Sequence, residues 1–278
     1  MRNSFRARPI DADKRSVGTV TVVGGSFRYP HAPVLAGLGA RTAGAGLVQL
    51  VAPDASRYAA AAHVPEAVFT KLAATCVPPA ADATALGMGL GGGVNTELLV
   101  SRLLSGSRGR FVLDADALGV LAMWYAKTGS FRPADGQQIV LTPHEGEAAR
   151  LLGCKREQVA RSRIDSAKEI AARYGATAVL KGAGTVVASA DGARTYVNAT
   201  GNAQMALAGM GDLLAGAIAA RWAALKDDGF KAAASAVWLH GAAGDKVAAD
   251  GIDPSIVNTA AAMGALRASL ERGARPAW

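Results

Sequence analysis

The sequence predicts an α/β protein in which a mainly parallel sheet carries helices on both of its faces. Short β-branched stretches alternate with longer stretches of helix-forming composition along the whole chain, and strands that alternate with helices form parallel sheets. Half of the 278 residues are hydrophobic but only 5% are aromatic, and glycine, at 33 residues, is abundant. Small residues of this kind suit helices packed closely on a sheet better than an aromatic-rich β-sandwich.

Each predicted element follows from a local pattern. The first strand is GTVTVV at residues 18–23, a β-branched run that ends at a pair of glycines. Further strands are expected at residues 47–51, 84–90, 110–113, 138–141, 176–180 and 185–188. Helices are expected at residues 32–47, 96–104, 115–125, 146–152, 161–174, 213–226, 230–249 and 258–272. Residues 52–83, which are rich in alanine and contain four prolines, are expected to form an irregular excursion at one edge of the sheet.

The chain is expected to form a single domain over residues 1–278, with residues 1–15 as a flexible arm. No internal repeat with a period of about 20 to 50 residues is visible, and no linker is longer than an ordinary loop. A chain of this length buries a sizeable core.

The charge balance favours small anionic ligands. Thirty basic and 22 acidic residues give a net charge of +8, which attracts anions. Since the charges are dispersed and no basic run contains interleaved aromatic residues, we expect a nucleotide or phosphorylated substrate and not a nucleic acid.

The composition also indicates a cytoplasmic protein. No apolar N-terminal segment and no uninterrupted run of about 18 apolar residues is present, so neither a signal peptide nor a membrane span is expected. The two cysteines, Cys76 and Cys154, are too few for a disulfide framework and are expected to be reduced, buried thiols.

One carboxylate, Asp212, lies in the otherwise small and apolar run ALAGMGDLLAG at residues 206–216. Gly209 and Gly211 allow backbone N–H groups to approach a ligand, and the apolar residues that follow predict a buried helix. The unpaired N–H groups at the start of that helix would bind an anion. The alternative is that Asp212 only caps the helix.

Polar residues also follow other predicted strands, at the strand ends where open α/β sheets bind ligands. The stretch KGAGT at residues 181–185 offers a cation, backbone amides and a hydroxyl, which suit a phosphate or a ribose. A solvated loop charge is the alternative for Lys181. Asn202 lies in a polar turn just upstream of residues 206–212, which we call the Asp212 loop.

Three carboxylates at strand ends are further candidates. In TPHEGE, His144 and Glu147 lie three residues apart, on one side of a first helical turn. Asp114 and Asp116 follow the strand at residues 110–113. Glu147 and Asp114 are candidate Mg²⁺ ligands, with helix capping as the alternative for each.

Seven segments together indicate a family. They are the stretch from GTVTVV to VAP (residues 18–53), GMGLGG, VLDADAL, LTPHEGEAARLLG, VLKGAGTVV, VNATGNAQMALAGMGDLLAG and LHGAAGD. In this order and at this spacing they resemble the NAD(P)H-hydrate dehydratases of the ribokinase-like superfamily, over residues 18–245.

The resemblance implies a three-layer α/β/α sandwich that dehydrates the hydrates of NADH and NADPH at the expense of a nucleotide, with Mg²⁺. Bacterial members generally use ADP and release AMP and phosphate, and the composition favours ADP over ATP here. Asp212 would be the catalytic base that deprotonates the hydroxyl of the substrate. The implied substrate-binding residues are Ala32, Gly89, Gly91, His144 and Asp212. The implied nucleotide-binding residues are Lys181, Gly182, Ala183, Gly184, Thr185, Asn202, Gly209 and Gly211.

The resemblance also implies a homo-oligomer, a tetramer in many members, and a separate protein for any epimerisation of the substrate. The sequence departs from the family pattern at Leu207, Ala208, Met210 and His31, which bears on nucleotide affinity and substrate fit. Two alternatives stay open. A kinase of hydroxymethylpyrimidine, hydroxyethylthiazole or a sugar would use the same fold and the same base but stop at the phosphorylated alcohol, and a non-catalytic relative would only bind nucleotide.

Overall fold

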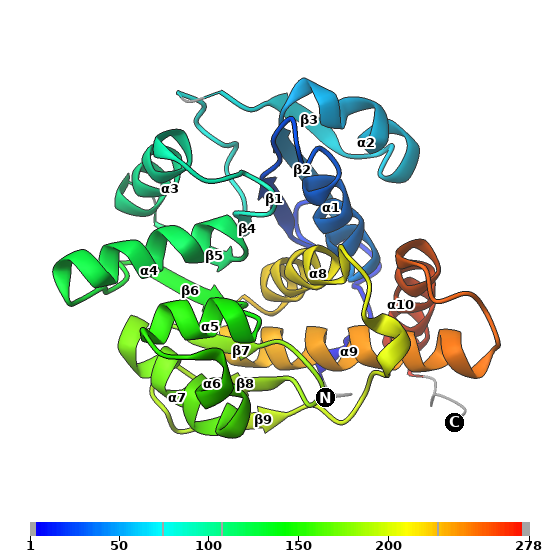
Figure 1. Ribbon diagram of the computed structural model, residues 1–278. Coiled ribbons are helices and arrows are strands. Elements are labelled where there is room, and N and C mark those ends of the chain that lie inside the picture. The colour runs from blue at the N-terminus through cyan, green and yellow to red at the C-terminus, as the bar shows by residue number, and fades with distance from the viewer. Residues whose placement is uncertain (1–3, 74, 107, 227, 274–278) are drawn as a thin grey trace.

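The computed structural model describes residues 4–73, 75–106, 108–226 and 228–273, which are built around a nine-stranded sheet (Figure 1). The strand order is β3-β2-β1-β4-β5-β6-β7-β8-β9. All neighbours from β3 to β7 pair in parallel, and β8 and β9 complete the sheet as an antiparallel hairpin. The strands are β1 (Thr19–Val23), β2 (Leu47–Ala52), β3 (Val68–Lys71), β4 (Ala83–Leu86), β5 (Gly109–Leu113), β6 (Gln137–Leu141), β7 (Thr177–Leu180), β8 (Val186–Ala188) and β9 (Thr195–Val197).

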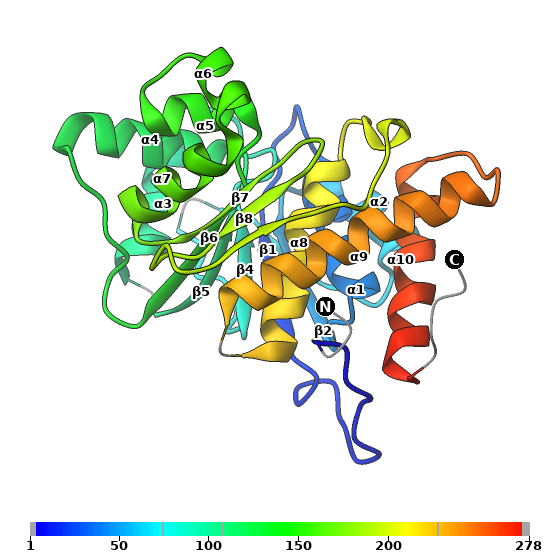
Figure 2. The same cartoon turned by 90° about the horizontal axis from the view of Figure 1, so that it is seen from below.

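Helices cover both faces of this sheet, which confirms the predicted three-layer α/β/α sandwich (Figure 2). One layer contains α1 (Ala32–Thr42), α2 (Arg57–His63), α8 (Met210–Leu225), α9 (Gly229–Ala249) and α10 (Ile256–Glu271). The opposite layer contains α3 (Val94–Gly106), α4 (Asp116–Thr128), α5 (Glu145–Leu152), α6 (Arg156–Arg161) and α7 (Arg163–Tyr174). Two short 3₁₀ turns, η2 (Asp54–Ser56) and η3 (Ala203–Met205), lie in the connections.

The central strands are apolar on both sides because each side faces a helical layer. In β1, Val22 belongs to the core under α1, α8 and α9, whereas its neighbour Val23 belongs to the core under α3 to α7. The small residues predicted to favour close packing do so between α1 and α8. A Cβ added to Gly216 would overlap the carbonyl oxygen of Ala36, and one added to Gly39 would overlap that of Leu213.

The predicted elements differ from the structure in a few places. Residues 52–83 are not an irregular excursion, since they contain η2, α2 and the edge strand β3. The sequence VFTK of β3 has few buried positions, so it lacks the apolar run that marked the inner strands. The helix expected at residues 32–47 already ends at Thr42, and the strand expected at residues 84–90 ends at Leu86, because Gly87 has φ +122° and turns the chain.

The N-terminal segment is anchored to the body of the protein. Residues 1–3 of the arm expected at residues 1–15 lie outside the described part of the chain. Phe5 is buried, with its ring centroid 6.1 Å from that of Trp238 and 4.1 Å from the guanidinium carbon of Arg221. At this residue the arm is therefore packed against α8 and α9.

Two further observations concern the cysteines and the helices. Both Cys76 and Cys154 are free thiols, but each is partly exposed and not buried as expected. Among the described residues, every helix is too short or too polar to cross a membrane.

Candidate active site

The Asp212 loop lies at the carboxyl edge of the parallel strands, where α8 begins. Gly209 is the residue before the helix and has φ +95°. A Cβ there would stand 2.5 Å from Leu35 Cδ1 and 2.7 Å from Ile256 Cδ1. These side-chain ends could shift, so it is the backbone conformation that favours glycine. The loop therefore enters α8 without a capping side chain. The Met210 N–H donates to the Leu207 carbonyl at 3.3 Å, and the N–H groups of Gly211 and Asp212 are the ones left for a ligand.

Asp212 is the third residue of α8 and does not cap it, which rules out the alternative considered for this carboxylate. No hydrogen bond from a described residue engages its oxygens. Burial raises the pKa of Asp212 to about 7, and the charge of Asp114 adds to the effect, while Lys181 opposes it. A carboxylate with a pKa near neutrality is suited to exchange protons at the pH of a cell.

Lys181 lies beside this carboxylate and is not a solvated loop charge, since only 17% of its side chain is exposed. Its Nζ is 2.6 Å from Oδ1 of Asp114 and 4.0 Å from Oε2 of Glu147. The hydroxyl of Thr142 donates to the same Asp114 oxygen at 2.8 Å. Burial alone would lower the pKa of Lys181, but the charges of Asp114 and Glu147 hold it above its ordinary value.

His144 and Glu147 form a capping box at the start of α5. Helix capping was the alternative to metal binding considered for Glu147. Glu147 Oε2 accepts a hydrogen bond from the His144 backbone N–H at 2.8 Å. The Nδ1 atom of His144 accepts from the N–H groups of Gly146 and Glu147 at 3.0 and 3.2 Å. The lone pair of Nδ1 is thereby used, so the proton of the neutral ring lies on Nε2. Its Nε2 lies 3.5 Å from Oε1 of Glu147, and 56% of the side chain is exposed, so this N–H is accessible to a ligand from the solvent side.

Three of the expected substrate-binding residues come together at the ends of β1 and β4. A Cβ added to Gly89 would stand 2.9 Å from Cβ of Ala32, so Gly89 and Ala32 are in contact. The N–H of Gly91 donates to Oδ2 of Asp116 at 2.8 Å. Asp116 thus holds the loop that contains Gly89 and Gly91. It does not cap α4, because it is the first residue of that helix and the residue at the capping position is Ala115.

Two of the expected nucleotide-binding side chains are already engaged within the protein. Thr185 Oγ1 donates to the Gly182 carbonyl at 2.9 Å. Asn202 Oδ1 accepts from Gln204 N–H, and its Nδ2 donates to Oδ1 of Asp245 at 3.0 Å. These residues shape their loops with their side chains, and their backbone groups are what the loops offer to a ligand. A pocket of about 430 Å³ opens beside Ala183 and Gly184.

The departures from the family pattern leave the Asp212 loop open. Leu207 is 43% exposed, and Ala208 is exposed as well, so neither side chain is packed into the bend. Met210 is buried in the core. His31 precedes α1 with an exposed side chain that makes no capping bond.

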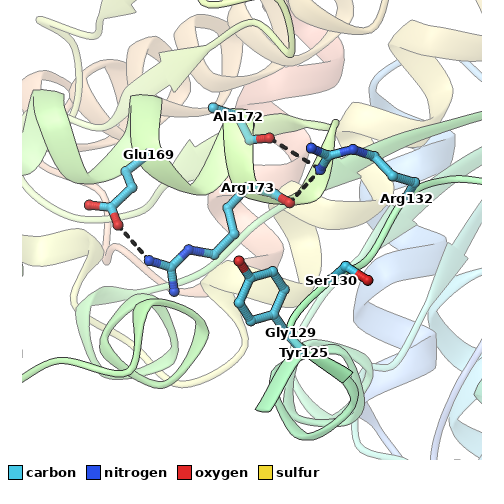
Figure 3. A pocket seen from close by; sticks show the side chains of 7 residues that line it. All are labelled: Tyr125, Gly129, Ser130, Arg132, Glu169, Ala172 and Arg173. Carbon is cyan, nitrogen blue, oxygen red and sulfur yellow. Dashed lines mark hydrogen bonds and ion pairs between the residues drawn. The ribbon is translucent and has the colours of Figure 1, made fainter. Parts of the chain in front are cut away.

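A second pocket, of about 350 Å³, is lined by seven residues (Figure 3), none of which is a predicted site residue. It lies between the ends of α4 and α7, at the amino edge of the sheet. Its two arginines are engaged by the protein itself. Arg132 donates to the carbonyl of Arg173 at 2.6 Å, and Arg173 pairs with Glu169 at 2.6 Å. These contacts close the end of α7 and leave the pocket without a free charged group.

No group of three or more His, Cys, Asp or Glu side chains within the described ranges is arranged to hold a metal ion by itself. Oxygens of Asp114 and Glu147 nevertheless lie 2.6 and 4.0 Å from Nζ of Lys181. Their carboxylate oxygens are the donors that Mg²⁺ prefers, and Mg²⁺ commonly binds through one or two carboxylates together with substrate phosphates. Lys181 and Thr142 engage Oδ1 of Asp114, and the His144 N–H engages Oε2 of Glu147. The other oxygen of each carboxylate is the one that would fit a Mg²⁺ ion entering with a nucleotide.

Sequence reasoning missed two residues that shape the site, Arg163 and Asp245. Asp245 accepts hydrogen bonds from Gly201 N–H at 2.8 Å and from Asn202, and Arg163 contacts the loop at residues 181–185. Asp245 lies within one of the family-like segments, but its partner is 44 residues away in the chain. No local pattern marks either residue.

Comparisons with known proteins identify the family of this chain. A family model described as NAD(P)H-hydrate dehydratase matches residues 20–262. An ADP-dependent (S)-NAD(P)H-hydrate dehydratase of Neisseria meningitidis is 39% identical over 248 residues, which cover 87% of this chain and 81% of that protein. A bifunctional NAD(P)H-hydrate repair enzyme of Moorella thermoacetica is 38% identical over 89% of this chain, which spans 48% of that protein's length.

A solved structure is also similar. It is an ADP/ATP-dependent NAD(P)H-hydrate dehydratase from Bacillus subtilis, co-crystallised with ATP and Mg²⁺. It matches with a TM-score of 0.86 and 28% identity, over 97% of this chain and 96% of that one. The chain therefore belongs to the NAD(P)H-hydrate dehydratase family.

Proposed function

We propose that this protein restores NAD(P)H from its hydrate in a dehydration that consumes ADP. The observation that carries the proposal is the Asp212 carboxylate at the open start of α8, with its pKa raised to about 7. Family membership supplies the substrate class, and the Neisseria relative, named as ADP-dependent, supports ADP as the nucleotide.

In the first step, Asp212 takes the proton of the substrate hydroxyl while the hydroxyl oxygen attacks the terminal phosphorus of ADP. A new O–P bond forms, and the O–P bond to AMP breaks. Because the transition state carries its charge on the phosphoryl oxygens, the N–H groups of Gly211 and Asp212 would stabilise it. A Cβ on Gly211 would stand 3.2 Å from Lys181 Nζ, so glycine keeps this approach open.

In the second step, the C–O bond to phosphate breaks, driven by the lone pair of the adjacent ring nitrogen. Loss of a proton from the neighbouring ring carbon then restores the dihydronicotinamide. Phosphorylation is needed because hydroxide is a poor leaving group at neutral pH. The Nε2–H of His144 suits a carbonyl or phosphate oxygen of the substrate, since it donates a hydrogen bond and its Nδ1 is engaged.

Lys181 and the backbone of residues 182–185 would hold the nucleotide, with Gly209 and Gly211 at the transferred phosphoryl group. Mg²⁺, when bound with the nucleotide, would neutralise the charge that develops on the phosphates. Asp114 and Glu147 are the residues that we propose hold it. Ala32, Gly89 and Gly91, which lie together at the neighbouring strand ends, would contact the hydrated cofactor.

The test is an absorbance assay for NADH regenerated from its hydrate, with ADP and ATP compared. Asp212→Asn should lower kcat by a factor of about 10² to 10⁴ while the variant still binds ADP. Near-normal turnover by this variant would remove Asp212 from the mechanism. A phosphorylated product that accumulates without NADH would favour the kinase alternative, and binding of ADP without any turnover of hydrate would favour a non-catalytic relative.

Four expectations stay predictions: a cytoplasmic location, a tetramer, a separate epimerase, and the absence of a nucleic-acid partner. Size-exclusion chromatography with light scattering tests the second directly.

A further inference from the structure

Arg163, the first residue of α7, lies between the two halves of the candidate site. Its Nη1 is 2.7 Å from Oε1 of Glu145, the first residue of α5. Its Nη2 donates to the carbonyl oxygens of Leu180 and Lys181, at 3.1 and 3.2 Å. Only 19% of the side chain is exposed. One guanidinium group therefore connects the start of α5 to the end of β7.

Both ends of this connection are next to residues of the proposed site. Glu145 directly follows His144, and Lys181 opens the loop at residues 181–185. Within that loop Gly182 has φ +139°, and a Cβ on it would stand 3.0 to 3.3 Å from the Arg163 guanidinium. The backbone of the loop therefore rests directly on this side chain.

Within the described part of the chain, Arg163 makes three hydrogen bonds with its two terminal nitrogen atoms and leaves its Nε without one. The Nε atom of Arg163 is buried without a hydrogen-bond partner among the described residues, and burying an unpaired N–H group is unfavourable. What arginine provides, and lysine does not, is a planar fork that reaches a carboxylate and two carbonyl groups at once. The three bonds of this fork fix the start of the loop at residues 181–185 relative to Glu145.

We infer that Arg163 is a positioning residue that holds the loop at residues 181–185 in its nucleotide-binding shape and fixes that loop relative to α5. This inference rests on the proposed function. If the loop is no longer held, only a fraction of the molecules has the binding shape, and the apparent affinity for nucleotide falls by that fraction.

The experiment compares Arg163→Lys with Arg173→Lys. Arg173 is a matched control on the same helix, since it pairs with Glu169 at 2.6 Å and donates to the carbonyls of Leu151 and Leu152 at 3.3 and 2.9 Å. It lies at the opposite end of α7, in the pocket of Figure 3. Calorimetry gives the Kd for ADP without any turnover, thermal unfolding gives the stability, and the NADH assay separates KM from kcat.

We expect Arg163→Lys to raise the Kd and the KM for ADP about tenfold, which corresponds to about 1.4 kcal/mol, with kcat within about twofold. Arg173→Lys should lower the unfolding temperature about as much as Arg163→Lys does, and it should leave ADP binding unchanged. An equal effect on ADP binding in both variants, or none in Arg163→Lys, would overturn the inference.

A second variant covers the case in which Arg163→Lys does not fold. Glu145→Ala releases the guanidinium from α5 and should raise the Kd for ADP about threefold; an unchanged Kd would again overturn the inference. If the unaltered protein itself failed to bind ADP, the proposed function would fall first, and the nucleotide role of Arg163 with it.

Discussion

Asp212→Asn should stabilise the protein while it removes the proposed base. In the folded protein, burial and the charge of Asp114 raise the pKa of Asp212 from 3.8 to about 7. Between those two pH values the native state keeps a proton that the unfolded chain releases. The free energy of unfolding of the unaltered protein therefore falls as the pH rises through this window. Asparagine is uncharged at every pH and avoids this loss.

The size of the gain follows from the two pKa values. A difference of about three pH units, at about 1.4 kcal/mol each, sets a ceiling of about 4 kcal/mol above pH 7. Asp212 is partly exposed, so solvent screening reduces this figure. Asparagine also loses the favourable interaction of a negative charge with the start of α8, about 0.3 to 1 kcal/mol. We expect a net gain of about 2 kcal/mol at pH 8 that shrinks toward zero near pH 4.

Urea unfolding of the ligand-free protein, followed from pH 4 to pH 8, measures this gain directly. Asp165→Asn is the matched control, because Asp165 holds the same third position in α7 but is exposed. It should lose about 0.3 to 1 kcal/mol, and never gain. An Asp212→Asn variant that is no more stable than the unaltered protein at pH 8, or whose gain does not depend on pH, would refute the reasoning.

Two further predictions concern the pH dependence and the packing. Because the base must be ionised, kcat/KM for the hydrate should fall tenfold per pH unit below about 7. Asp116→Asn should move this acidic limb of the pH profile to lower pH, since the charge of Asp116 raises the pKa of Asp212. An acidic limb that stays in place would contradict the electrostatic account. Gly216→Ala should destabilise the protein by about 3 kcal/mol, because the new methyl group overlaps the Ala36 carbonyl. Gly119→Ala, within α4 and with open space around it, should instead stabilise it by about 0.5 to 1 kcal/mol; urea unfolding that gives both variants the same sign would contradict this packing.

The elements that the sequence predicts well are those with a strong local pattern. The buried strand β1 reads as a β-branched run. The glycines before Asp212 predict an open helix start, which the φ of +95° at Gly209 confirms. The edge strand β3 was missed because half-exposed residues carry no such run. From the sequence, Glu147 is either a Mg²⁺ ligand or a helix cap, and the structure places it in a capping box.

The sequence by itself determined the alternation of strands and helices, the glycine-bounded loop and the presence of a carboxylate in it, because these depend on backbone preferences within a few residues of one another. Only the tertiary structure decided that Lys181 pairs with Asp114, 67 residues away, and that Arg163 rests against the loop at residues 181–185. The raised pKa of Asp212 also depends on the tertiary structure, since it arises from burial and from charges on other strand ends. Desolvation and contact between distant segments exist only once the sheet brings those strand ends to one edge.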